Sequence, residues 1–323
     1  MLKNVFYWIS SYKDSIVDIL SKRSKGDRIR YENAFIKWYF NTENKQYIPI
    51  KSVVDNEDLK YWEEQGYLKP DSKLEKELKE AYSRFVEDAA SAVDEYEEPK
   101  DFINDQQRKR LNTLYKGDPL SYEKNKNIML SLYYVLGGRN NHLSAPKPNL
   151  KLYSFELFGT PLNTQYDYCS PFEIDKVFGS YGSFFDFKIV KGGMYYANPP
   201  YDDKLMTRAM KKIIRTLMTV KAPLTIAVTL PVWDPKTQRE YKFPVFSSKF
   251  ESYDILTGTG RAFVRDHKVF TKKEFNFYDY FDRSFIPIAN THLFILSNRK
   301  DPYITIERYM QLINSGTNKK NKN

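Results

Sequence analysis

The chain has 323 residues and a mass of 38.3 kDa, and at about 100–200 residues per domain this length predicts two domains. Lysine and arginine number 51 against 41 acidic residues, a balance that favours a polyanionic partner such as nucleic acid, with a merely solvated basic surface as an equal alternative. Aromatic residues make up 16% of the chain, which excludes a disordered protein.

The single cysteine, Cys169, excludes an internal disulfide and a thiolate metal cluster. We therefore expect an intracellular protein without a metal site. The first 20 residues are apolar, but Ser, Lys and Asp interrupt them every few positions, so neither a signal peptide nor a membrane span is predicted.

Apolar residues recur every three or four positions through much of the first part of the chain, which is the helical period. This spacing predicts helices over 5–20, 71–93, 103–115 and 123–136, the last ended by two glycines. We expect a mostly helical domain over residues 1–135.

Beyond Lys147 the pattern changes to short apolar runs bounded by Gly, Pro or Asn. These runs predict buried strands at 150–159, 192–200, 223–233 and 291–298. A stripe of apolar residues predicts a helix over 202–220, between the second and third runs, and strand, helix, strand at this spacing implies a parallel sheet. We expect an α/β domain over residues 136–316 and a disordered basic tail over 317–323.

The tetrapeptide Asn198–Tyr201 stands where the strand ending near 197 is followed by a helix. In an open α/β sheet, ligands bind at this end of the strands. The sequence suits methylation of an exocyclic amino group, because the Asn198 side chain and the Pro199 carbonyl can accept the two hydrogens of the amine while Tyr201 stacks on the base. A plain turn is the alternative.

Further short motifs follow one another in a fixed order along residues 120–313. They are Phe155–Asn163, Tyr168–Ser170, Phe178–Ser180, Asp186-Phe187, Ala197–Tyr201 with Leu205-Met206, Leu230–Trp233, Ser248–Phe250 and Arg265–His267. In order and spacing, this set resembles the cap-specific adenosine N6-methyltransferases of the phosphorylated-CTD-interacting-factor family.

The resemblance implies transfer of a methyl group from S-adenosylmethionine to N6 of the adenosine beside an m7G cap, preferably when its ribose is 2′-O-methylated. It implies a Rossmann-like methyltransferase domain preceded by a helical domain, which together form a basic groove for m7G-capped RNA. By position, it assigns the target base to Asn198, Pro199, Pro200 and Tyr201. It assigns the S-adenosylmethionine site to Phe158, Thr160, Pro161, Leu162, Asn163, Asp186, Phe187 and Asn198.

Two departures from the family pattern bear on function. Animal members carry a WW domain, but the interval from Trp38 to Trp62 lacks the Tyr-Tyr pair and the β-turn pattern of that module. This leaves nucleus and cytoplasm both open, with the cytoplasm slightly favoured because the WW domain is absent, and it leaves open a partner from the polymerase or capping machinery. Tyr201 stands where the family often has Phe, which preserves an aromatic face for stacking.

Basic and aromatic residues alternate through 257–285, which predicts a flexible loop suited to single-stranded RNA. Its candidate contacts are Arg261, Arg265 and Lys268, and the alternative is a loop that packs its rings on the domain. Trp233 is a candidate floor for a base or cap pocket. Arg139 is a candidate contact for a cap phosphate, or closes a helix end.

Two other functions remain open from the sequence. One is a DNA or internal-RNA adenine N6-methyltransferase, since the same tetrapeptide serves such enzymes. The other is an inactive RNA-binding subunit that retains the methyltransferase fold.

Overall fold

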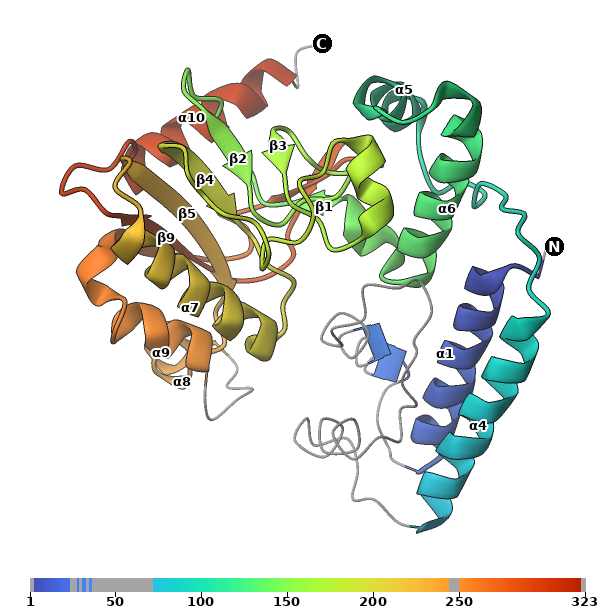
Figure 1. Cartoon of the computed structure of the whole chain (residues 1–323). Helices are drawn as coiled ribbons and strands as arrows, with labels where there is room; N and C mark the ends of the chain where they lie inside the picture. The colour runs from blue at the N-terminus through green and yellow to red at the C-terminus, as the bar shows by residue number, and fades with distance from the viewer. Residues whose placement is uncertain are drawn as a thin grey trace. The chain divides into compact units, whose positions relative to one another are not determined.

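A computed structural model of the chain describes residues 3–23, 28, 31–32, 35–36, 72–243 and 250–320. The chain divides into two compact units (Figure 1). One contains residues 1–105 and 117–141, and the other contains residues 106–116 and 142–323. The domain boundaries expected from the sequence remain a prediction.

The first unit is helical in the part that is described. Its helices are α1 (Val5–Arg23), α4 (Ser72–Ala90) and α6 (Tyr122–Val135), with the 3₁₀ turn η1 (Pro119–Ser121) and most of η2 (Gly138–His142). Helix α1 starts at Asn4, whose side-chain oxygen accepts hydrogen bonds from the backbone N–H groups of Phe6 and Tyr7 at 3.0 and 3.1 Å. This is an N-cap, which satisfies donors that the helix itself cannot.

Helices α1 and α4 pack through the apolar stripes expected from their spacing. Ile9 and Ile16 of α1 and Leu78 of α4 are fully or almost fully buried. Tyr12 of α1 stacks on Phe85 of α4 with ring centroids 4.9 Å apart. The opposite face of α4 is charged and exposed, as expected of an amphipathic surface helix.

The second unit is mixed α/β, as the sequence predicts, and contains a six-stranded sheet in the order β3-β2-β4-β5-β9-β6. Its strands are β2 (Ser154–Glu156), β3 (Asp167–Tyr168), β4 (Gly193–Ala197), β5 (Leu224–Pro231), β6 (Val264–Phe270) and β9 (Thr291–Ser297). Strands β3, β2, β4 and β5 are mutually parallel, and β9 is antiparallel to both of its neighbours. Strand β6 therefore runs in the same direction as the parallel strands.

Glycine is required where the chain enters β4. Gly193 has a φ of +145°, and a Cβ there would lie 2.6 Å from the carbonyl oxygen of Tyr153. Any larger residue would push apart the start of β4 and the segment that leads into β2. The glycine therefore allows the two strands to pair in register, with Tyr196 opposite Glu156.

Each face of the sheet has its own apolar core. Helices α7 (Asp203–Thr219) and α9 (Glu251–Thr257) cover one face (Figure 1). There Met206, Met210 and Ile213 pack on alternate residues of β4 and β5. Helix α10 (Ile306–Lys320) lies on the other face and contributes Ile306 and Tyr309. Because both faces are covered, every residue of β4 and β5 is buried.

The remaining elements of this unit are short. A three-stranded antiparallel sheet joins β1 (Leu143–Ser144), β7 (Phe277–Asp279) and β8 (Ser284–Ile286). The other helices are α5 (Asp105–Leu114), η3 (Glu173–Phe178), α8 (Pro235–Glu240) and η4 (Arg261–Phe263).

One expectation about an irregular segment is wrong. The stretch 257–285, predicted as a flexible loop, contains β6, β7 and the first residues of β8. Strand β6 is an edge strand whose residues are mostly only partly buried, so no apolar run marks it in the sequence. Helix α10 extends to Lys320. The predicted disordered tail 317–323 remains a prediction.

Within the described ranges, no helix has both the length and the apolar content needed to cross a lipid bilayer.

Candidate functional site

The strand order changes direction between β2 and β4. From β2 the chain continues to β3 on one side, and from β4 it continues to β5 on the other side. In open α/β sheets, ligands bind in the crevice expected at such a position, between the loops that follow the two strands at the carboxyl edge of the sheet. Glu156 ends β2, and Ala197 ends β4 directly before the predicted tetrapeptide.

Asn198 is held from the neighbouring strand. The hydroxyl of Thr229, on β5, donates a hydrogen bond of 2.7 Å to the side-chain oxygen of Asn198. Thr229 is almost completely buried, and Asn198 is partly exposed. A carbonyl oxygen has two lone pairs, so this bond fixes the orientation of the Asn198 amide and leaves its oxygen able to accept a second hydrogen.

The two prolines lead from Asn198 into α7. Pro199 is buried and Pro200 is exposed. The Pro200 carbonyl accepts a hydrogen bond from the backbone N–H of Asp202 at 2.8 Å, which closes the turn. The carboxylate of Asp202 then caps α7 by accepting from the N–H of Leu205 at 2.9 Å. The tetrapeptide is thus a rigid connection from a buried strand to a capped helix.

Tyr201 lies against two other aromatic rings. Its ring meets that of Trp233 edge to face, with centroids 6.0 Å apart, and that of Phe277 at 6.4 Å. Burial raises the pKa of the Tyr201 hydroxyl, and a weaker interaction with the Thr291 side chain opposes that rise. The structure therefore brings together Tyr201 and Trp233, two residues predicted separately as base contacts.

Two segments predicted to bind the methyl donor also meet. Phe158 follows β2, and its ring contacts Phe184 and Phe185 edge to face, with centroids 5.1 and 6.3 Å away. These two phenylalanines directly precede Asp186, which is exposed. Phe158 is partly exposed, so an aromatic surface and a carboxylate lie near each other beside the crevice.

The rest of the predicted donor loop forms a tight turn. The side-chain oxygen of Asn163 accepts from the N–H of Thr160 at 2.9 Å, and its amide donates to the carbonyl of Leu143 at 2.8 Å. Pro161 and Leu162 are buried within the unit. Their predicted contribution to the donor site is thus one of backbone shape, with Thr160 the more exposed side chain.

Phe187, also predicted to bind the methyl donor, is partly buried. Its ring stacks on the buried ring of Phe155 at a centroid distance of 4.8 Å and an angle of 6°. Phe187 thereby anchors the segment that carries Asp186 to the core of the sheet.

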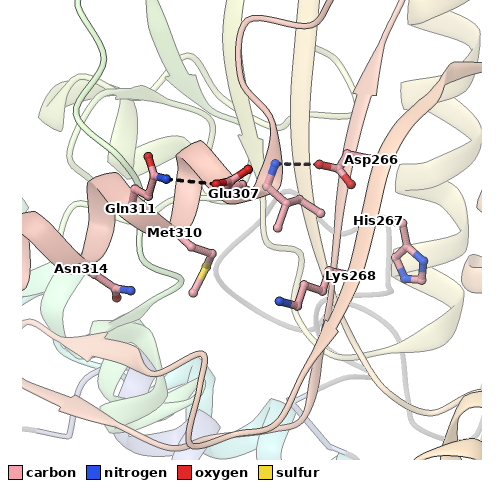
Figure 2. Close-up of a pocket in the computed structure, with 8 residues that line it drawn as sticks. Asp266, His267, Lys268, Glu307, Met310, Gln311 and Asn314 are labelled. Carbon is pink, nitrogen blue, oxygen red and sulfur yellow. Dashed lines mark hydrogen bonds between the residues drawn. The ribbon is translucent and has the colours of Figure 1, made fainter.

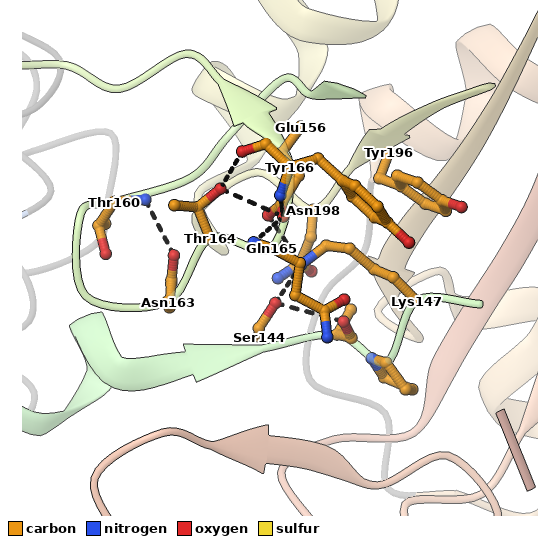
Figure 3. A network of polar contacts seen from close by, with 12 residues as sticks. Ser144, Lys147, Glu156, Thr160, Asn163, Thr164, Gln165, Tyr166, Tyr196 and Asn198 are labelled. Carbon is orange, nitrogen blue, oxygen red and sulfur yellow. Dashed lines mark hydrogen bonds and ion pairs between the residues drawn. The ribbon is translucent and has the colours of Figure 1, made fainter. Parts of the chain in front are cut away.

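A buried ion pair at the end of β2 was not identified from the sequence (Figure 3). The Nζ atom of Lys147 lies 2.8 Å from Oε2 of Glu156, and their side chains are only 5% and 2% exposed. The other carboxylate oxygen accepts from the backbone N–H groups of Gln165 and Tyr166 at 2.5 and 3.2 Å. The signal in the sequence that could have indicated this pair is the position of Glu156 within an otherwise apolar strand. This network ties the end of the donor loop to β2.

A second buried pair supports Trp233 and was also missed. Oδ2 of Asp234 lies 2.8 Å from Nε2 of His292, and Oδ1 accepts from the N–H of Thr237 at 2.8 Å. Burial acts to raise the pKa of Asp234, but the hydrogen bonds from His292 and Thr237 outweigh it and lower that pKa. The pair fixes Asp234, which follows Trp233 directly and caps α8 (Pro235–Glu240).

The residues predicted to bind RNA are not all brought together. Arg139 lies in the first unit, where its guanidinium donates to the carbonyl of Asp101 at 3.1 Å and so supports a local turn. Arg261 is exposed in η4, and the guanidinium of Arg265 donates to the carbonyl groups of Ala262 and Arg299. Arg261 and Arg265 lie before and at the beginning of β6, away from the carboxyl ends of the parallel strands.

Lys268 is better placed than these arginines. It pairs with Leu293 of β9, which in turn pairs with Thr229 of β5, so Lys268 lies level with Thr229, the residue that holds Asn198, two strands along the sheet from β5. Lys268 also lines a pocket of about 460 Å³ between β6 and α10, across from Met310 (Figure 2).

Within the described part of the chain, no group of three or more His, Cys, Asp or Glu side chains is arranged to hold a metal ion. Burial raises the pKa of Cys169 to about 12, so its thiol stays protonated near neutral pH. The interval from Trp38 to Trp62 and the motif residues Ser248 and Lys249 lie outside the described residues.

Comparison with protein families gives a match over residues 110–266, to the family described as "Phosphorylated CTD interacting factor 1 WW domain". The match covers just under half of the chain and includes both segments that meet at the crevice. Although the description mentions a WW domain, the matched residues include β2, β3, β4 and β5 of the six-stranded sheet. The predicted absence of a WW module concerns earlier residues and is not tested by this match.

Two curated relatives match shorter stretches. The Homo sapiens protein named mRNA (2'-O-methyladenosine-N(6)-)-methyltransferase is 39% identical over 106 residues, which is 32% of this chain and 15% of that protein. The Mus musculus protein of the same name is 38% identical over 87 residues, which is 26% of this chain and 12% of that protein. The chain therefore matches only a small part of the length of these relatives. The resemblance predicted from the motifs is confirmed.

Proposed function

We propose a function on the premise that this chain belongs, through residues 110–266, to the phosphorylated-CTD-interacting-factor family. The proposed activity is that of an S-adenosylmethionine-dependent mRNA cap-specific methyltransferase. The enzyme modifies N6 of the first transcribed adenosine beside an m7G cap, preferably when the ribose of that adenosine is 2′-O-methylated. The observation that carries the proposal is the position of Asn198. It stands at the carboxyl edge where the strand order changes direction, with its amide oriented by Thr229.

The fold supports this activity. The parallel strands are covered by helices on both faces, and the crevice between the loops after β2 and β4 matches the ligand position of Rossmann-like domains. We therefore assign the second unit to a Rossmann-like methyltransferase domain. A role of the helical first unit in lining an RNA groove remains a prediction from the family resemblance.

The residues beside the crevice suit the methyl donor. When bound, S-adenosylmethionine supplies an electrophilic methyl group on a positively charged sulfonium. Aromatic faces attract such a cation and stack on adenine, and Phe158 with Phe184 and Phe185 offers those faces. The exposed carboxylate of Asp186 can accept hydrogen bonds from ribose hydroxyls. Thr160 and Asn163 shape the loop that closes this side.

The target amine is oriented by two oxygens. Its nitrogen is conjugated with the adenine ring and is a weak nucleophile, so positioning contributes most of the rate. Asn198 accepts one N6 hydrogen through its side-chain oxygen, and Pro199 accepts the other through its backbone carbonyl. The nitrogen lone pair then points at the methyl carbon. On methylation the nitrogen would give up one of these two hydrogens as a proton to solvent, and the donor would leave as a neutral thioether.

The adenine ring is held by stacking. Tyr201 presents an aromatic face, and its edge-to-face contact with Trp233 keeps that face in one orientation. Tyrosine and phenylalanine offer the same stacking surface, so Tyr201 replaces the Phe of many relatives without loss of function.

Capped RNA is the proposed partner, consistent with the formal net charge of +10. Lys268 is the best-placed of the predicted RNA contacts, because it lies level with Thr229, the residue that holds Asn198. An intracellular, cytoplasmic location remains part of the proposal and rests on sequence features alone.

The test is methyl transfer from labelled S-adenosylmethionine to four short RNAs, followed by nucleoside digestion. The RNAs begin with m7G-capped 2′-O-methyladenosine, m7G-capped adenosine, unmethylated-G-capped adenosine and uncapped adenosine. The proposal predicts label in N6-methylated adenosine from the two m7G-capped RNAs only, with the 2′-O-methylated one preferred.

The other outcomes identify the alternatives. Equal label from all four RNAs contradicts cap specificity and favours an internal-RNA or DNA adenine methyltransferase. An absence of label from every RNA, with the donor bound at equilibrium, contradicts catalysis and favours an inactive RNA-binding subunit.

A further inference from the structure

Lys212, in the middle of α7, makes three hydrogen bonds to one short loop. Its Nζ atom donates to the backbone carbonyl oxygens of Phe184, Phe185 and Phe187 at 2.6, 2.8 and 2.8 Å. An ammonium group has three donors, so all three are used on this loop. A surface lysine in contact with water does not have such a fixed set of partners.

The loop is a compact turn whose carbonyl groups converge on the ammonium. The backbone N–H groups of Asp186 and Phe187 both donate to the carbonyl of Ser183 at 3.0 Å, and the N–H of Phe185 donates to the Ser183 hydroxyl at 3.2 Å. These bonds satisfy the donors of the turn, and Lys212 satisfies its acceptors. Without the ammonium, three carbonyl groups in a partly buried place would lose this donor together.

Aromatic contacts reinforce the position of Lys212. The Nζ atom lies 4.9 Å from the centre of the Phe184 ring. The guanidinium of Arg208, one turn earlier on α7, lies 4.5 Å from the centre of the Phe185 ring. Two cations of α7 thus hold both phenylalanines of the loop.

The same two phenylalanines form the surface against which Phe158 packs. Phe158 opens the loop after β2, and Asp186 lies inside the turn that Lys212 holds. The position of Lys212 therefore affects both segments assigned to the methyl donor. It also joins them to α7, the helix that begins directly after the target-base tetrapeptide.

We propose that Lys212 is a positioning residue for the methyl donor, holding the 184–187 turn so that Phe158 and Asp186 keep the arrangement that receives the adenosyl group. The inference rests on the proposed methyltransferase function. It adds a residue that neither the motifs nor the tetrapeptide chemistry identified.

The test compares Lys212→Met with Lys211→Met. Lys211 is the adjacent residue and makes an exposed ion pair with Glu251 at 2.8 Å, so its replacement removes the same charge without touching the turn. Binding of S-adenosylmethionine is measured by calorimetry, and KM for the donor, KM for capped RNA and kcat are measured with saturating partners.

We expect Lys212→Met to raise the donor Kd and KM about tenfold or more, with kcat at saturating donor and KM for RNA changed less than about threefold. Lys211→Met should resemble the wild type. Lys212→Arg should recover most of the donor affinity, because a guanidinium can donate to several carbonyl groups. Lys212→Gln retains one donor group, so its affinity for the donor should lie between those of Lys212→Met and Lys212→Arg. It is the variant to use if Lys212→Met does not fold.

Three results would overturn the inference. The first is an unchanged donor affinity in Lys212→Met and Lys212→Gln. The second is an equal loss in kcat and in both affinities, which would mean general loss of structure. The third is a wild-type protein that binds no S-adenosylmethionine, in which case the proposed function fails as well. Normal donor binding by the wild type separates failure of this inference from failure of the function.

Discussion

The Thr229 hydroxyl donates a hydrogen bond of 2.7 Å to the side-chain oxygen of Asn198, across the pairing of β4 with β5. This contact fixes the orientation of the Asn198 amide. In the proposed reaction it holds the side-chain oxygen in one place, and the second lone pair of that oxygen accepts from the target amine.

Replacement of Thr229 tests that role. Thr229→Val removes the hydroxyl and preserves the shape, so kcat on capped RNA should fall about tenfold, because a neutral hydrogen bond contributes about 0.5–1.5 kcal/mol. Thr229→Ser keeps the hydroxyl and should stay within about threefold of the wild type. The measurement is kcat for both variants under saturating donor and RNA. Equal kcat values for Thr229→Val and Thr229→Ser would show that the hydroxyl does not position Asn198.

Removal of either partner from the buried pair of Lys147 and Glu156 should strongly lower the free energy of unfolding. Lys147→Met leaves the Glu156 carboxylate buried without its counter-ion, and we expect a loss of about 3–5 kcal/mol in the free energy of unfolding. Lys188→Met, at an exposed lysine, is the matched control and should change little. Urea unfolding monitored by circular dichroism gives both values.

The double variant sharpens this prediction. Lys147→Met combined with Glu156→Gln removes both charges, so it should be more stable than Lys147→Met alone. A double variant less stable than the single one would contradict the explanation by an uncompensated charge.

Asp234 gives stability a dependence on pH. Its folded-state pKa is lowered by hydrogen bonds from His292 and Thr237, which outweigh burial, so its stabilising effect is complete above the unfolded pKa of about 3.9. That effect is lost as pH falls through the folded value. Asp234→Asn should be about 1–3 kcal/mol less stable than the wild type at pH 5. Urea unfolding should show this difference shrinking at pH 3, and a constant difference would argue against the ionised carboxylate.

Much of the fold could be predicted because apolar residues recur at regular spacings in the helices and strands that form its cores. The apolar stripe of α7, including Leu205, Met210 and Ile213, gave a helix within one residue of the observed start. Strands β4 and β5 were predicted for the same reason, since burial on both faces makes them continuous apolar runs. Strand β6 was missed, because an edge strand needs apolar residues on only part of its surface.

The site was predicted less completely than the fold. Asn198 and Tyr201 could be predicted because their chemistry is local to four residues. The two buried pairs could not be predicted in this way. Lys147 and Glu156 are 9 positions apart, and Asp234 and His292 are 58 positions apart, so each pair meets only in the folded chain. The register that places Lys268 level with Thr229, and Arg265 away from it, likewise exists only in the assembled sheet.

The most direct test of the central claim is nucleoside analysis of an m7G-capped RNA that begins with 2′-O-methyladenosine, after incubation with S-adenosylmethionine and either the wild type or Asn198→Ala. The account predicts an N6-methylated first adenosine with the wild type and a rate lower by about 10²–10³ with Asn198→Ala, since one polar stabiliser of the transition state is lost. Near-normal N6-methylation by Asn198→Ala, or no N6-methylation by the wild type, would contradict it.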